Sequence, residues 1–117
     1  MGNIRIYFSV DTEFSEYEFT QKGYRIDVYA KVGEELFNIR VYTLVRLQQD
    51  FIRAWEICGE YMAEPNLVIV RDTSKDEIIR TVYSLFSHGF FKQIKPVEGV
   101  DTSELVWVNV NNSVDAT

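Results

Sequence analysis

The sequence predicts an α+β fold in which an antiparallel β-sheet has two helices packed on one face, in the order β-β-β-α-β-α-β-β. Two patterns predict it. Apolar and polar residues alternate in three stretches before residue 43, with the period of two expected of half-buried strands. Apolar residues recur every three or four positions in two later stretches, which is the spacing of an amphipathic helix. The 117 residues fit a single domain, 1–117, of which only the last few residues are expected to fray.

Three strands are expected before the first helix. The alternation in 4–10 predicts the first strand, and the alternation in 24–32 and 37–42 predicts the second and the third. Gly33 begins the short link between the last two, as in a hairpin turn. Residues 24–43 are therefore expected to form a β-hairpin.

The residues after Thr43 predict an amphipathic helix that Thr43 caps. Its apolar residues are spaced by three or four positions and are expected on the buried side: Leu44, Leu47, Phe51, Trp55, Cys58 and Met62. Gly59 marks the end of this helix or a weak point near it, and Pro65 excludes its continuation. Trp55 should therefore lie in the core.

The remaining chain predicts a strand, a helix and two further strands. The apolar run in 66–71 indicates a strand that is buried on both faces. Ser74 and Glu77 form an S-x-x-E capping box at the start of a helix. Residues 90–94 and 104–110 are the last two strand candidates.

The net charge of −6 is concentrated at the two ends of the chain. Residues 1–20 and residues 100–117 each carry a net charge of −3, whereas acidic and basic residues balance between them. This distribution disfavours free nucleic acid and an anionic membrane as partners. The chain has no apolar run long enough to span a membrane, no secretory signal and a single cysteine, Cys58, so we expect a cytoplasmic protein.

The sequence predicts no catalytic site, and we expect no enzyme activity, no cofactor and no metal. His88 is expected to cap the second helix and Cys58 to fill the core, and two such residues are too few for a zinc site. The glycines are scattered singly, so no phosphate-binding loop is expected. Asp11 with Glu13, or Glu16 with Glu18, could form a carboxylate pair, but their polar neighbours disfavour the raised pKa that a catalytic acid needs.

Two surfaces are candidates for binding a partner. The first is the segment DTEFSEYEF, in which carboxylates alternate with aromatic residues. Its candidate partner-binding residues are Asp11, Glu13, Glu16, Tyr17 and Glu18. In the alternative interpretation, Phe14 and Phe19 pack into the core and the acidic residues simply face water.

The second candidate is the polar face of the predicted sheet. Its candidate residues are Tyr7, Arg25, Tyr29, Arg40 and Tyr42. Tyrosine and arginine are enriched at interface hot spots, but they also form ordinary cross-strand pairs on a solvated face. As a binding face, this set would suit stacked bases of single-stranded nucleic acid.

The order of motifs in the middle of the chain resembles a known family. A hairpin with a glycine turn, a Thr-x-x-x-Leu entry into a helix, an aliphatic strand and a last amphipathic helix follow one another in 24–86. Gly33, Thr43, Leu47 and the run at 67–70 occupy the matching places. In this respect the chain resembles the immunity protein 8 family, bacterial proteins encoded beside polymorphic or contact-dependent-inhibition toxins. The likeness covers about half of the chain.

The resemblance implies a small cytosolic binder that neutralises a cognate toxin, often a basic nuclease, by covering its active site or substrate groove. Leu44 and Arg46 stand where the family commonly has proline and tryptophan. The first alternative is a nucleic-acid-binding module that uses the Tyr/Arg face, although the acidic ends would repel phosphate. An acidic nucleic-acid mimic would need denser charge. The sequence leaves open which toxin is bound, by which face, and whether the domain dimerises.

Overall fold

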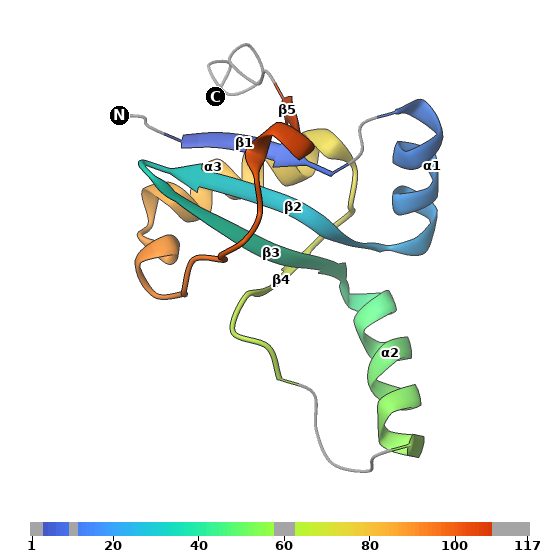
Figure 1. Ribbon diagram of the computed structural model, residues 1–117. Coiled ribbons are helices and arrows are strands. Elements are labelled where there is room, and N and C mark those ends of the chain that lie inside the picture. The colour runs from blue at the N-terminus through green and yellow to red at the C-terminus, as the bar shows by residue number, and fades with distance from the viewer. Residues whose placement is uncertain (1–3, 10–11, 58–62, 109–117) are drawn as a thin grey trace.

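The computed structural model describes residues 4–9, 12–57 and 63–108, without the side chains of Glu13, Ser15 and Ile57. In this part of the chain the fold is α+β, with three α-helices and a five-stranded sheet (Figure 1). The elements are β1 (Ile4–Phe8), α1 (Glu13–Lys22), β2 (Tyr24–Val32), β3 (Glu35–Thr43), α2 (Leu44–Ile57), β4 (Leu67–Val70), α3 (Lys75–Ser87) and β5 (Val106–Val108). Two 3₁₀ turns, η1 (Phe90–Lys92) and η2 (Thr102–Glu104), lie between α3 and β5.

The sheet has the strand order β4-β3-β2-β1-β5 and is mixed. β1 pairs antiparallel with β2 and β5, and β2 pairs antiparallel with β3 in the predicted hairpin. β3 and β4, however, are parallel, so the prediction of a purely antiparallel sheet is wrong at this edge. The reason is the helical connection through α2, since a crossover of this kind returns the chain in the same direction.

The core lies between the sheet and α3. α3 covers one face of the sheet with Ile78, Ile79 and Val82, which pack with the alternate residues of β1, β2 and β3 that point to the same side. The segment between η1 and β5 crosses the opposite face (Figure 1), where the backbone N–H of Val97 donates to the carbonyl of Leu36. Within the described residues, no helix is long and apolar enough to cross a membrane.

The structure confirms the helix caps that the sequence predicted at Ser74, His88 and Thr43. The Ser74 side chain accepts a hydrogen bond from the backbone N–H of Glu77 at the start of α3. The ring of His88 lies 2.7 Å from the carbonyl of Ser84 at the end of the same helix. Thr43 accepts from the backbone N–H of Arg46 at the start of α2, 3.3 Å away.

The predicted element order is wrong at two places, and the observed order is β-α-β-β-α-β-α-β. The DTEFSEYEF segment contains most of helix α1 and is not an extended or looped stretch. Residues 90–94 contain the 3₁₀ turn η1 and no strand, because Gly89 turns the chain sharply at φ +79° and directs Phe91 into the core. Cys58, Gly59 and Met62 lie outside the described residues, as does the end of the last predicted strand.

α2 does not pack on the sheet with α3, contrary to the prediction. It begins directly where β3 ends and continues away from the sheet, as Figure 1 shows. Trp55, predicted to be buried, is 56% exposed, and Phe51 and Leu44 are also exposed. β4 is likewise an edge strand with Ile69 exposed, so the prediction that it is buried on both faces is wrong.

Candidate functional site

The outer side of α1 is an exposed aromatic surface. Phe14 and Tyr17 are 70% and 64% exposed, and their spacing of three residues places them on the same side of the helix. Glu18, four residues after Phe14, lies on this side and is partly exposed. Phe14 therefore does not fill the core as one interpretation of the sequence expected. We call Phe14, Tyr17 and Glu18 the α1 surface.

The inner side of α1 packs on a buried arginine. Arg25 is only 1% exposed and lies between the rings of Phe8 and Phe19, with its guanidinium carbon 4.3 Å from each ring centroid. Its Nη1 donates to Oε1 of Glu16 at 2.8 Å, while Nε and Nη2 donate to the two carboxylate oxygens of Asp27 at 3.1 and 3.3 Å. One positive charge is thus shared by two carboxylates in an aromatic setting.

Glu16 also joins α1 to the start of α3. Its second carboxylate oxygen accepts from the backbone N–H of Lys75 at 2.7 Å, in the first turn of α3, where a negative charge is favoured. Nearby, the hydroxyl of the buried Thr73 donates to the carbonyl of Phe19 at 2.9 Å. These contacts hold α1 against the sheet and α3. Glu16 therefore has a structural position rather than the outward position expected of a partner-binding residue.

A β-bulge explains why an arginine occupies the interior. The register of β2 against β3 shifts between Arg25, which is opposite Val41, and Val28, which is opposite Ile39. Both Arg25 and Val28 consequently point to the α3 side, and Ile26 is left exposed. The alternation read from the sequence assumed an unbroken strand and placed Arg25 on the outer face.

The five residues of the predicted Tyr/Arg face do not form one open surface. Arg25 is in the interior, Tyr7 and Tyr42 are buried, and Tyr29 and Arg40 are partly buried. Burial raises the pKa of the Tyr42 hydroxyl above its usual 10.0, and the nearby Glu64 carboxylate raises it further. The stacking platform required by the nucleic-acid alternative is therefore not present in these five side chains.

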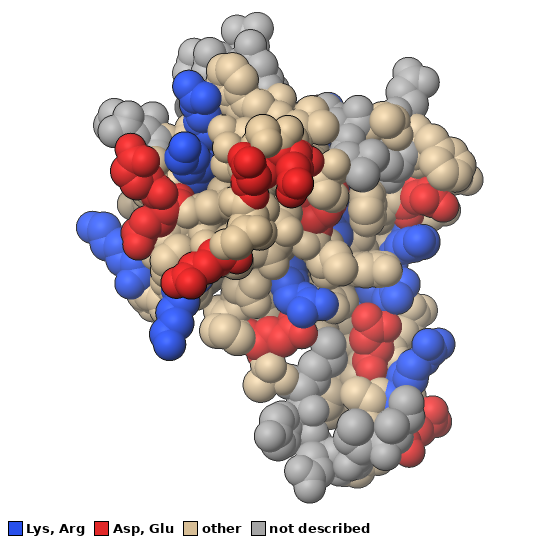
Figure 2. All heavy atoms as spheres, in the orientation of Figure 1, with Lys and Arg blue, Asp and Glu red and all other residues tan. Residues whose placement is uncertain are grey.

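Trp107, which the sequence analysis did not single out, lies exposed on β5. It pairs with Tyr7 across the strands, and the guanidinium carbon of Arg5 is 4.6 Å from its ring centroid. Figure 2 shows acidic and basic groups interspersed on the face of the molecule that it draws, without a continuous basic area on that face. The arrangement differs from the charged groove expected of a nucleic-acid channel.

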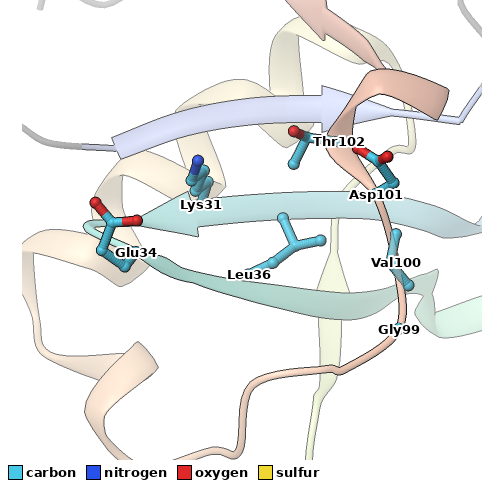
Figure 3. Close-up of a pocket in the computed structure, with 7 residues that line it drawn as sticks. All are labelled: Lys31, Glu34, Leu36, Gly99, Val100, Asp101 and Thr102. Atoms are coloured by element: carbon cyan, nitrogen blue, oxygen red, sulfur yellow. The ribbon is translucent and has the colours of Figure 1, made fainter.

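A shallow groove of about 460 Å³ separates the end of the β2–β3 hairpin from the segment that crosses the sheet (Figure 3). It is lined by Lys31, Glu34, Leu36, Gly99, Val100, Asp101 and Thr102. Asp101 caps η2 and accepts from the backbone N–H of Ser103 at 2.9 Å, which lowers the pKa of its carboxyl. The Asp101 carboxylate therefore stabilises the 3₁₀ turn. Because the groove is open to solvent, Asp101 is not the desolvated acid that general acid catalysis needs.

α2 is held to the molecule by its polar side. Arg46 lies over the ring of Tyr24, 4.3 Å from its centroid, and donates to Asp50 at 3.0 Å and to the carbonyl of Lys22 at 3.2 Å. The apolar side is consequently left exposed. It comprises Leu44, Val45, Phe51, Ile52 and Trp55, each between 40% and 64% exposed. We call these five residues the α2 strip.

The candidate residues of the DTEFSEYEF segment divide into three groups. Tyr17 and Glu18 face outward, Glu16 faces inward, and Asp11 and the side chain of Glu13 are outside the described part of the structure. In that part, no group of three or more histidine, cysteine, aspartate or glutamate residues is arranged to hold a metal ion.

Comparison with protein-family models, curated proteins and solved structures finds no match to this chain.

Proposed function

We propose that this protein binds and neutralises a cognate bacterial toxin, most simply a basic nuclease domain, by covering its active site or substrate groove. The α1 surface is the observation that supports this function best. It exposes two large aromatic side chains on a helix that is fixed from beneath by the Arg25 contacts. Aromatic residues on rigid elements are typical hot spots of protein interfaces.

Charge supports a basic partner. The chain carries −6, and half of this excess lies in residues 1–20, which include α1. Negative charge close to a contact surface accelerates the encounter with a positively charged protein and competes for the groups that would hold phosphate. The toxin class itself rests on the resemblance to the immunity protein 8 family, and the α1 surface would supply the contact.

The proposal places the gene of the toxin beside the gene of this protein. It is tested by co-expressing the protein with the product of that neighbouring gene and measuring growth and affinity. Tyr17→Ala and Phe14→Ala should each weaken toxin binding by about 2 kcal/mol if they are hot spots, mainly through faster dissociation. Trp107→Ala is the matched control, because Trp107 is a similarly exposed aromatic residue on β5 and belongs neither to the α1 surface nor to the α2 strip. Wild-type affinity and full protection by the Tyr17→Ala, Phe14→Ala double variant would refute the assignment of the α1 surface.

A further inference from the structure

We propose that the α2 strip is the contact surface of a homodimer, in which α2 of one copy packs against α2 of the other. The strip carries no charged side chain and is apolar except at one position. Its members occur at 44, 45, 51, 52 and 55, and the uncharged Gln48 fills the one gap. Positions 44, 48, 51 and 55 have the alternating four-three spacing at which two helices interlock side chains along a seam.

Charge favours a second copy of this chain over a basic toxin as the molecule that covers the α2 strip. α2 contains two arginines, one aspartate and one glutamate, so its net charge is zero. A basic partner gains nothing from a strip without carboxylates and is attracted instead to the acidic ends of the chain. A second copy also carries −6, and like charges repel unless the contact forms where the molecule is neutral. α2 is itself neutral. Its first turn lies beside the end of α1, which belongs to the acidic part of the chain, but the rest of α2 projects away from α1 and from the sheet (Figure 1).

The area of the strip suits a symmetric contact. From their exposed fractions and ordinary side-chain sizes, the five residues offer roughly 500 Å² per copy. A two-fold pair that buried all of this surface would remove about 1,000 Å² from water, the lower bound of specific interfaces. The strip is about 17 Å long at the helical rise of 1.5 Å per residue, so two antiparallel helices can align over its whole length. An isologous contact requires such a self-complementary surface.

The test is the mass of the full chain in solution, measured by sedimentation equilibrium at about 1 to 100 μM, the range in which a contact of this size is populated. Wild-type protein should approach twice the 13.7 kDa of one chain as its concentration rises. Ile52→Glu should raise the dimer dissociation constant by at least about 30-fold, because each substitution introduces two buried charges into a two-fold interface. Tyr17→Glu adds the same charge to an equally exposed site on α1 and should leave the dimer intact.

The concentration series of the wild-type protein keeps the test independent of how well any variant folds. A wild-type mass of one chain throughout the range would overturn the proposal, as would a dimer that persists in folded Ile52→Glu. A monomeric wild-type protein whose toxin affinity falls in Ile52→Glu would instead assign the strip to the toxin. Because dimerisation is measured without toxin, its failure would leave the role of the α1 surface untouched, and failure of toxin binding would not affect the mass measurement.

Discussion

Replacing Arg25 with methionine tests whether the buried ion cluster holds α1 in place. Methionine keeps much of the side-chain length but removes a cation that makes three hydrogen bonds, at 2.8, 3.1 and 3.3 Å, and contacts two aromatic rings. The carboxylates of Glu16 and the buried Asp27 would then lie close together without a counter-charge. Removing one partner of a buried pair costs about 3 to 5 kcal/mol, a large part of the ~5 to 15 kcal/mol that stabilises a typical domain.

The assay is urea denaturation followed by circular dichroism, with amide hydrogen exchange in α1 as the local measurement. Combining Arg25→Met with Glu16→Gln and Asp27→Asn should recover part of the loss, because no uncompensated charge then remains. Exchange protection in α1 should fall more than protection in α3, since α1 depends on this cluster directly. A loss below about 1 kcal/mol, or equal loss of protection in α1 and α3, would refute the argument, because ordinary surface ion pairs contribute no more than that.

Three further outcomes are expected. Gly23→Ala should lower the free energy of unfolding by about 1 to 3 kcal/mol in denaturant titrations, because Gly23 has φ +74° and an added Cβ would lie 2.8 Å from Oγ1 of Thr43. Gly33→Ala is the control and should cause a smaller loss, because a Cβ there meets open space; equal losses would contradict the argument. Trp55→Ala should change the free energy of unfolding of the monomer by less than about 1 kcal/mol, because its side chain is outside the core; a loss of 3 kcal/mol or more would restore the buried position that the sequence predicted. Hydrogen bonds from Ser74 lower the pKa of the Asp72 carboxyl below 3.8, so the stability that this carboxylate contributes is present above that pH and is lost as the pH falls through the folded pKa. Asp72→Asn should therefore be less stable than wild type near neutral pH and equally stable in strong acid. A stability difference that stays constant across the pH titration would argue against this role.

The sequence predicted elements whose determinants are local. The β2–β3 hairpin follows from alternation on both sides of Gly33, and α3 follows from its capping box and from the spacing of its apolar residues. α1 lacks such a signal, because its aromatic residues point to opposite sides: Phe14 outward and Phe19 toward Arg25. What fixes α1 is a set of contacts to residues far away in the chain, and periodicity does not report such contacts.

The position of α2 shows a second limit of prediction from the sequence. Its amphipathic pattern was recognised correctly, and the spacing identified Leu44, Phe51 and Trp55 as one face. A pattern of this kind says which residues avoid water, but not whether the covering surface belongs to the same chain. The contact of Arg46 with Tyr24 holds the polar side of α2 against the rest of the chain, which leaves the apolar side exposed. Only the structure could therefore distinguish a core helix from a helix with an exposed apolar face.

The orientations of the candidate partner-binding residues could be predicted only in part, for a related reason. Tyr17 and Glu18 face outward as expected of partner-binding residues, whereas Glu16 is drawn inward by Arg25. Its inward position depends on the bulge in β2, which changes the side to which Arg25 points. In sequence, the spacing of Arg25 and Asp27 by two residues was compatible with an outer-face ion pair, so nothing local indicated an interior arginine.

The two proposed contacts differ in chemistry and use different residues. The α1 surface combines aromatic side chains with acidic charge, whereas the α2 strip is apolar and neutral. The end of α1 lies beside the start of α2, where Arg46 donates to the carbonyl of Lys22 and the backbone N–H of Thr43 donates to the carbonyl of Gly23. The two surfaces share no residue, so the two proposed contacts do not compete for a side chain. If both proposals hold, a dimer carries two α1 surfaces, one on each copy, and presents twice the negative charge of one chain to a basic partner.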